Sequence, residues 1–260
     1  MELTTVLGIS LAIVSMVIAF VLEGGHITAL FAPTAFLIVF GGTIGATVTC
    51  FTMAELKTLP GVLKTAITKQ KLDPASLIDL IVKLADKARR DGLLSLESSI
   101  DEVDSPFLKK GIQLIVDGTD PEVIQNILET ENYAVEERHS VGSNIFEVAG
   151  GFAPTMGIIG TVMGLVHVLG NLSNPDELGP AIAMAFIATL YGVGSANIVY
   201  LPLAEKLKNT AKKEGVMREI MMEGLIALRA GRNPIIIREH LTAFLRPEKK
   251  GDKAPGDEED

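Results

Sequence analysis

The stretch of sequence that decides the fold runs VAGGFAPTMGIIGTVMGLVHVLGNLSNP, from Val148 to Pro175. It contains no Asp, Glu, Lys or Arg. A helix needs about 20 apolar residues to cross roughly 30 Å of hydrocarbon, because each residue advances the helix by about 1.5 Å. This stretch is therefore long enough and apolar enough to be a transmembrane helix.

Three further stretches have the same character. They are Leu3 to Leu22, Gly24 to Ala54 and Leu178 to Ala204. The whole chain of 260 residues is 48% hydrophobic and only 21% charged, and its mean hydropathy is +0.36, which is too apolar for a soluble domain. The single cysteine, Cys50, excludes a disulfide framework. We therefore expect an all-α, polytopic membrane protein with four transmembrane helices.

The distribution of cations predicts the orientation of the spans. All 23 Lys and Arg residues lie in two segments, one from Glu55 to Glu147 and one from Glu205 onward. The short connections around Glu23 to Ala32 and Asn171 to Glu177 contain none. Because cationic flanking segments stay on the cytoplasmic side, both termini and the long middle segment are expected to be cytoplasmic. The amino terminus lacks the basic start and the cleavage site of a secretory signal, so it is expected to remain as the first span.

The middle segment is predicted to be a compact helical domain. Three dipeptides place an N-cap residue before a proline at the first helical position: Asp73-Pro74, Ser105-Pro106 and Asp120-Pro121. Apolar residues after Pro74 recur at spacings of three and four, and Gly92 is placed to end that helix. Further helices are expected through Leu93 to Ile100 and through Phe107 to Ile115, and the helix from Pro121 is expected to continue into the third span.

The last part of the chain is predicted to extend the fourth span. The pattern after Pro202 is helical as far as Gly231, and Asn233-Pro234 begins one more short helix. The predicted organisation has five parts: 1–54 with the first two transmembrane helices, 55–146 with a cytoplasmic helical domain, 147–204 with the third and fourth transmembrane helices, 205–246 with a cytoplasmic helical extension, and 247–260 as a disordered acidic tail.

The third and fourth spans are unusual in their density of small and hydroxylated residues. These are Gly150, Gly151, Pro154, Thr155, Gly157, Gly160, Thr161, Gly164 and Gly170 in the third span, and Thr189, Gly192, Gly194, Ser195 and Asn197 in the fourth. Any one of them is most simply explained by helix packing. As a set they favour a hydrated, helix-lined passage, because Pro154 frees a backbone carbonyl that needs another partner. The only ionisable residues here are Glu147 and His167. If ions pass, another chain must supply the carboxylate.

Other functional classes find no support in the sequence. There is no nucleotide-binding Gly-x-x-x-x-Gly-Lys-Ser/Thr loop, and no nucleophile or metal-ligand spacing stands out. A formal net charge of −9 with scattered cations argues against a nucleic-acid surface. We therefore expect neither an enzyme nor a nucleic-acid-binding protein, with no cofactor and no structural metal.

Three segments carry a resemblance to a known family. Residues 150–167 (GGFAPTMGIIGTVMGLVH), 174–197 (NPDELGPAIAMAFIATLYGVGSAN) and 201–208 (LPLAEKLK) closely resemble the MotA/TolQ/ExbB family of ion-motive-force proteins. The resemblance covers essentially the whole chain. TolQ and ExbB proteins have three spans, so the first pair of spans and the large insertion favour the MotA branch, the stators of the bacterial flagellar motor.

The resemblance implies an assembly and a partner. It implies five copies of this chain, a homopentamer, around two copies of the single-span protein MotB in the bacterial inner membrane. An aspartate of MotB would carry the Na⁺ or H⁺, which matches the absence of a carboxylate from the uncharged stretches of the third and fourth spans. Ion passage would turn the ring, and the cytoplasmic domain would push on the rotor protein FliG. Membrane lipids are the remaining expected partner.

The resemblance also implies roles for individual residues. The channel proline falls on Pro154, and the ion pathway would include Thr155, Gly157, Thr161 and Thr189. The proline that couples ion movement to the cytoplasmic arm falls on Pro202. The rotor-contacting charges fall on Arg89 and Glu97, with Arg90 beside them. Without the resemblance, these three charges would be interpreted as an ordinary solvated face.

The identity of the ion is predicted from two hydroxyls. Sodium-driven relatives carry hydroxyls at the positions of Thr161 and Thr189, whereas many proton-driven relatives have alanine at the first. A hydroxyl oxygen can coordinate a desolvated sodium ion beside a carboxylate, and a proton needs no such shell. The sequence therefore favours Na⁺ over H⁺. A proton-driven stator, an ExbB/TolQ-like energiser and a passive membrane scaffold stay open as alternatives.

Overall fold

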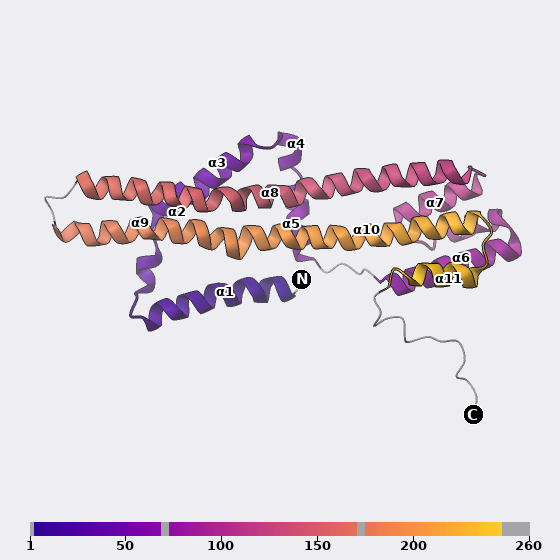
Figure 1. The fold of residues 1–260 in the computed structure, drawn as a ribbon, viewed down its shortest axis with the longest axis horizontal. Helices are drawn as coiled ribbons and strands as arrows, with labels where there is room; N and C mark the ends of the chain where they lie inside the picture. The colour runs from indigo at the N-terminus through magenta and orange to yellow at the C-terminus, as the bar shows by residue number, and fades with distance from the viewer. Residues whose placement is uncertain (1–2, 69–72, 171–174, 246–260) are drawn as a thin grey trace, which may run out of the picture. The chain divides into compact units, whose positions relative to one another are not determined.

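The computed structural model describes residues 3–68, 73–170 and 175–245, and within these ranges the chain is helical without any strand (Figure 1). Four of its helical stretches are long and apolar enough to cross a membrane: Leu3–Leu22, Ile27–Thr49, and parts of Pro121–Gly170 and Leu178–Arg229. The all-α fold class is confirmed. The acidic tail that the sequence predicts to be disordered lies outside the described residues.

The chain divides into two compact units. One contains residues 1–70 and 138–209, and the other contains residues 71–137 and 210–260. The two longest helices, α8 (Pro121–Gly170) and α10 (Leu201–Arg229), each contribute to both units. As predicted, α8 continues without interruption from Pro121 through the third span, and Pro154 lies inside it.

The first unit contains the four apolar stretches. The first is α1 (Leu3–Leu22). The second is built from several short elements: η1 (Ile27–Leu30), α2 (Pro33–Phe36), the π-helical η2 (Leu37–Gly41) and α3 (Gly42–Thr49). The helices α4 (Met53–Leu56) and α5 (Leu59–Ile67) follow, and a capping box formed by Thr52 and Glu55 begins α4.

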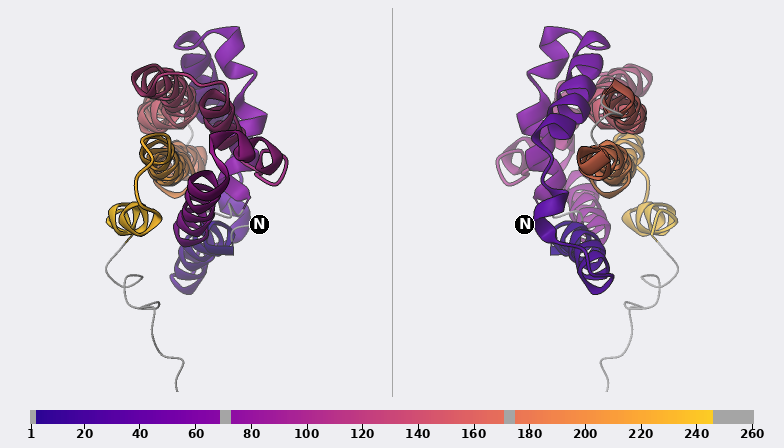
Figure 2. Two further views of the ribbon diagram at one scale, coloured as in Figure 1. Left: turned by 90° about the vertical axis from the view of Figure 1, so that its right-hand side faces the viewer. Right: turned by 90° about the vertical axis from the view of Figure 1, so that its left-hand side faces the viewer.

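The third and fourth spans pair with each other in the first unit. The helix α9 (Pro175–Ser195) returns antiparallel to α8, and Figures 1 and 2 show the two side by side. A π-helical segment, η4 (Ala196–Tyr200), joins α9 to α10. The π turn lies directly before Pro202, whose ring clashes with the carbonyl four residues earlier in a regular α-helix. Within this π turn, the N–H of Leu201 donates to the carbonyl of Ala196, five residues earlier and not four as in an α-helix.

The second unit is a small helical domain with its own apolar core. Its elements are α6 (Pro74–Asp91), the 3₁₀ helix η3 (Leu93–Ser99), α7 (Pro106–Val116), the start of α8, the end of α10 and α11 (Pro234–Thr242). The helix expected through Leu93 is thus a 3₁₀ helix. Figure 1 shows α11 lying along α6. The core side chains include Ile78, Ile112, Ile124, Leu225 and Leu241.

The local sequence explains where the helices of this unit begin and end. Asp73 accepts from the N–H of Ala75 at the start of α6, and Ser105 and Asn233 cap α7 and α11 in the same manner. The end of α6 is fixed by Gly92, whose φ of 86° is a backbone conformation that side chains with a Cβ rarely adopt. The chain therefore turns sharply between the last turn of α6 and η3.

Candidate functional site

Two threonine hydroxyls meet between α8 and α9. The Oγ1 atoms of Thr161 and Thr189 lie 2.6 Å apart. The same Thr161 oxygen is 2.8 Å from the carbonyl oxygen of Ala185 and 3.1 Å from that of Gly157. A hydroxyl has one proton, so it cannot donate fully to both carbonyls at once. Four neutral oxygens are thus gathered around one half-buried point in the spans.

Small residues allow the two helices to come close enough for this contact. A methyl group added at Gly157 would lie 2.9 Å from the carbonyl oxygen of Ala188, and one added at Gly192 would lie 2.5 Å from that of Ala153. At Gly160 the added carbon would lie 2.7 Å from the Ala188 methyl group. Backbone therefore packs on backbone along this seam, as expected for small residues in membrane helices.

The other residues of the expected pathway lie at different places on α8. Pro154 is half-buried, one turn before the seam residue Gly157. Thr155 is exposed, and its hydroxyl donates to the carbonyl of Phe152 at 2.7 Å. The structure thus brings Gly157, Thr161 and Thr189 together and leaves Thr155 on the open side of the helix.

A second polar contact attaches α9 to the second apolar stretch. The hydroxyl of Tyr191 donates to the carbonyl of Leu30 and accepts from the N–H of Ala32 at 3.3 Å. The sequence analysis did not single out Tyr191. Its only signal there is a phenol in an apolar span, which needs a hydrogen-bond partner when it is buried.

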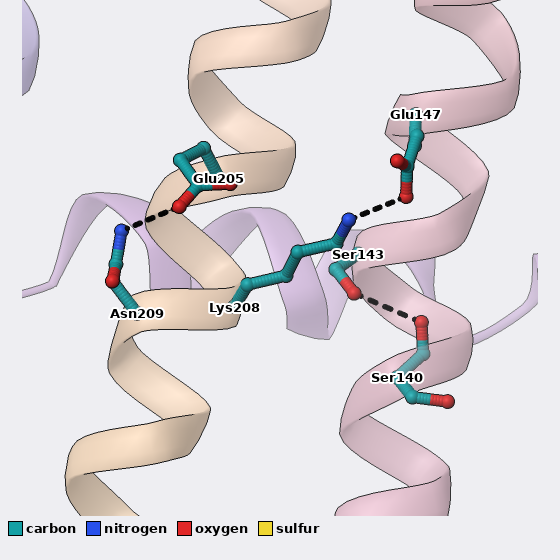
Figure 3. Close-up of polar contacts among 6 residues, drawn as sticks. All are labelled: Ser140, Ser143, Glu147, Glu205, Lys208 and Asn209. Atoms are coloured by element: carbon teal, nitrogen blue, oxygen red, sulfur yellow. Dashed lines mark hydrogen bonds and ion pairs between the residues drawn. The ribbon is translucent and has the colours of Figure 1, made fainter.

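An ion pair connects α8 to α10 within the first unit, on the amino-terminal side of the Thr161 cluster along α8 (Figure 3). The Lys208 ammonium of α10 donates to Oε2 of Glu147 on α8 at 2.6 Å. Glu205 on α10 accepts instead from Asn209 in its own helix at 3.1 Å. Figure 3 shows Lys208 reaching across to α8 while Glu205 points away from it. Sequence spacing gives no direct sign of this pair, because 61 residues separate its members.

An apolar cavity of about 650 Å³ lies elsewhere in the first unit, between α1, α9 and η4. Phe20, Phe40, Leu190 and Ile198 are among the side chains that line it. Apart from Glu23, its lining residues carry no ionisable carboxylate, amine or imidazole. It therefore lacks a constellation that could perform acid–base chemistry or hold a metal.

The charged residues expected to meet a rotor belong to the second unit. Arg89 and Arg90 lie in the last turn of α6 and Glu97 lies in η3, and all three are exposed. Arg90 also pairs with Asp86 in its own helix. Lys87 donates to the hydroxyls of Ser98 and Ser99 at 2.8 and 2.7 Å, which connects α6 to η3 on either side of Gly92.

No group of three or more His, Cys, Asp or Glu side chains with metal-binding geometry occurs among the described residues. The Thr161 cluster consists of two hydroxyls and two carbonyls, and neither Val148 to Pro175 nor Leu178 to Ala204 contains a carboxylate. These neutral oxygens can coordinate a small cation, and a carboxylate brought to them by another chain would strengthen its binding.

Comparison with known proteins decides the family. Residues 99–227 match the MotA/TolQ/ExbB proton channel family, and residues 6–92 match the family Motility protein A N-terminal. The chain is 41% identical to Motility protein A of Bacillus subtilis over 246 residues, which cover 94% of this chain and 91% of the relative. It belongs to the MotA/TolQ/ExbB family. The family is one of channels, which confirms the expectation that the chain is not an enzyme.

Further relatives and solved structures agree. The chain is 37% identical to the chemotaxis protein PomA of Vibrio alginolyticus over 96% of this chain and 98% of the relative. The structure of C. jejuni MotAB superposes with a TM-score of 0.91 at 31% identity, over 95% of this chain and 97% of that one. The MotAB stator complex from Bacillus subtilis gives 0.90 at 40% identity, over 94% and 96%. Membership of this family and the four apolar stretches together establish a multi-pass membrane protein.

Proposed function

We propose that this chain is a stator subunit of the bacterial flagellar motor. With a MotB partner it forms an inner-membrane cation channel that converts ion-motive force into torque on the rotor. The relatives described as Motility protein A and the similar chains from MotAB complexes support this function. The observation that carries it is the Thr161 cluster, where two hydroxyls and two carbonyls gather between α8 and α9 without a carboxylate.

The driving ion is Na⁺ rather than H⁺ in this proposal. Sodium is a hard cation, and its preferred ligands are oxygens such as the hydroxyl and carbonyl groups around Thr161. Thr161 and Thr189 each add an oxygen that an alanine would not. A proton carried on a partner's carboxylate needs neither oxygen. The pairing of the two hydroxyls at 2.6 Å supports their acting together.

The partner is a MotB dimer that supplies the ion-carrying aspartate. Five copies of this chain surround it, with both termini and the second unit in the cytoplasm. Confinement of all 23 cations to residues 55–147 and 205–260 supports this orientation. The side chains of α1 are not buried within the chain, and its sequence is apolar throughout, which suits contact with lipid and with neighbouring copies.

Torque reaches the rotor protein FliG through the second unit. Arg89 and Glu97, with Arg90 beside them, form the contact, and Pro202 couples ion movement to α10. The exposure of the three charges supports their availability to a partner. The π turn of η4 before Pro202 supports a bend at that place, since π turns and prolines are the usual sites of helix kinks.

The test is swimming speed in cells that lack their own stators and express this chain with its neighbouring partner gene. External sodium is varied at fixed pH, and choline keeps the ionic strength constant. The control strains carry either gene alone. Speed that rises with sodium supports the proposal. Restored speed that is indifferent to sodium would make the chain a proton-driven stator. Absence of motility with both proteins present in the membrane would contradict the stator function.

A further inference from the structure

Glu147, which pairs with Lys208, is the only carboxylate in α8 between residue 138, where the first unit's part of this helix begins, and the close helix contact at Ala153. Towards the other end of the helix, the sequence from Val148 to Pro175 contains no Asp or Glu. Both side chains of the pair are about half exposed, with 49% exposure for Glu147 and 44% for Lys208. The rest of the chain therefore leaves the carboxylate accessible and does not enclose it in a core.

Helix geometry places Glu147 on the same face as the proposed ion pathway. Glu147, Pro154 and Thr161 are spaced by seven residues, and seven residues fall only about 20° short of two full turns. The three positions therefore follow one another along one side of α8, about 10 Å apart. Both polar contacts are made with the continuous helical stretch of α9, η4 and α10. Thr161 contacts Thr189 of α9, and Glu147 contacts Lys208 of α10.

We propose that Glu147 is the cytoplasmic release site of the cation, and that Lys208 sets its affinity. This inference rests on the stator function proposed above. A cation that leaves the hydroxyl cluster travels along the Pro154 face and meets the Glu147 carboxylate next. The Lys208 ammonium already occupies that carboxylate at 2.6 Å, so it competes with the incoming cation. A conduction site must bind strongly enough to receive an ion and weakly enough to release it.

Two side chains near the pair show that the contact is specific to these residues. Glu205 lies on α10 only three residues before Lys208, yet its carboxylate accepts from Asn209 of the same helix. Ser143, one turn before Glu147, is buried and donates to the carbonyl of Ser140. Of these neighbouring side chains, Lys208 is the one placed to compete for the Glu147 carboxylate (Figure 3). Glu205→Gln is a matched control, since it removes a nearby carboxylate from α10 without removing either member of the pair.

If the ion pair has only a structural role, the two single variants are expected to change the sodium requirement in the same direction, and the experiment tests this difference. If the pair only connects α8 to α10, removing either partner breaks the same bond and changes function in the same direction. If Glu147 is a release site, removing the ammonium strengthens cation binding, whereas removing the carboxylate weakens it. The two single variants then move the sodium requirement in opposite directions.

The experiment measures swimming speed against external sodium for the full chain expressed with its partner, at fixed pH and ionic strength. Lys208→Met is expected to lower both the top speed and the half-saturating sodium concentration, because release becomes slower. Glu147→Gln is expected to lower the top speed and raise the half-saturating concentration. Each shift is expected to be about two- to fivefold, the size of one half-exposed charge interaction. Glu205→Gln is expected to match the unchanged protein.

Shifts of both variants in the same direction would overturn the release site, and so would two variants with an unchanged half-saturating concentration. Should Glu147→Gln fail to accumulate in the membrane, Lys208→Met and Lys208→Arg decide the matter. The release site requires a lowered half-saturating concentration for methionine and a value within about twofold of the unchanged protein for arginine. Failure of the unchanged protein to drive any sodium-dependent motion would instead contradict the proposed function, so the two failures are distinguishable.

Discussion

The hydroxyl oxygens of Thr161 and Thr189 lie 2.6 Å apart, although 28 residues separate them in the chain. The contact requires α8 and α9 to approach at the distance of touching backbones, which the glycines at 157 and 192 permit. A threonine hydroxyl that needs only one hydrogen-bond acceptor can donate to a carbonyl of its own helix, as Thr155 does to Phe152. Thr161 also reaches the opposite helix, so its position is set by the helix pair.

Loss of the Thr161 hydroxyl should weaken sodium-dependent motion. In Thr161→Ala one of the four clustered oxygens is removed, and an interaction of this kind is worth on the order of 1 kcal/mol, or roughly fivefold in affinity. We expect the half-saturating sodium concentration for swimming to rise by about that factor or more. Thr161→Ser keeps the hydroxyl and should keep most of the function. Speed is measured in stator-less cells at fixed pH.

The control for this prediction is Thr49→Ala. Thr49 is an exposed threonine in α3 whose hydroxyl donates to the carbonyl of Ala46 in its own helix at 2.6 Å. It has the same chemistry as Thr161 without the cross-helix contact. An unchanged sodium response in Thr161→Ala, at normal membrane level, would refute the assignment of this oxygen to the ion.

A methyl group at Gly192 should separate α8 from α9. The added carbon would lie 2.5 Å from the carbonyl oxygen of Ala153 and 2.9 Å from the Cα of Gly157, and backbone atoms cannot rotate away as a side chain can. Overpacking of this kind costs about 1–3 kcal/mol. For a chain of this size, each kcal/mol lowers Tm by roughly 2–4 °C. Gly192→Ala is therefore expected to lower the Tm of the solubilised complex and to reduce motility.

Gly194→Ala provides the matched comparison for Gly192→Ala. Gly194 lies in the same helix two residues later, and a methyl group there meets nothing within 4 Å inside the chain. Its Tm is expected to equal that of the parent or to exceed it by roughly 2–4 °C, since alanine is intrinsically about 1 kcal/mol more favourable than glycine within a helix. Equal loss of stability in the two variants would show that the seam is not the cause.

The sequence predicted the helices of this protein well because their signals are local. An uncharged run identifies a span, and Asp73-Pro74 or Asn233-Pro234 identifies a helix start. These signals need no knowledge of the rest of the chain. The 3₁₀ helix η3 and the π turns η2 and η4 were not predicted, because they depend on how Gly92 turns the chain and on how neighbouring helices satisfy displaced carbonyls.

The candidate site was predicted as a set of residues but not as a geometry. Thr161 and Thr189 were singled out by their resemblance to family positions, and the meeting of their oxygens depends on the register of two antiparallel helices. The pairing of Glu147 with Lys208 depends on the same register. A periodic pattern tells which face a residue occupies, and it does not tell which residue of a second helix lies opposite.

Reversal of charge at Arg89 or Glu97 should reduce torque while leaving the stator in the membrane. Both side chains are exposed on either side of Gly92, so their loss should cost the fold little. We expect Arg89→Glu and Glu97→Arg each to lower swimming speed at high load, with normal amounts of protein in the membrane. Arg90→Glu should have a smaller effect, because Arg90 already pairs with Asp86.

The comparison for these rotor variants is Lys213→Glu, which reverses an exposed charge on α10 in the same unit. It should swim like the parent. Full speed in the double variant Arg89→Glu with Glu97→Arg would count against a rotor contact at this corner, unless the membrane level of protein had risen to compensate. Immunoblotting of membranes therefore accompanies the speed measurement.

The backbone amides at the start of α4 should lose protection against hydrogen exchange as the pH falls below about 4.5. The backbone N–H of Thr52 and then its hydroxyl donate to the Glu55 carboxylate at 2.6 and 2.7 Å, and these bonds hold the pKa of Glu55 below its ordinary value of 4.5. A carboxyl whose pKa is lowered on folding stabilises the folded state above its unfolded pKa. That contribution is lost as the pH drops through the lower, folded value. Above pH 4.5 the cap is fully formed.

Hydrogen exchange of the amides from Thr52 to Leu56, corrected for the intrinsic effect of pH, measures this loss. Protection should be constant well above pH 4.5 and should decline below about pH 4.5 in the parent, as the pH falls through the lowered pKa of Glu55. Glu55→Gln keeps a capping side chain that does not titrate, so its protection should be lower at neutral pH but independent of pH over the same range. A decline of equal size in the glutamine variant would assign the effect to another group. Because Glu55 is partly exposed to solvent, high salt should also weaken the pH dependence in the parent.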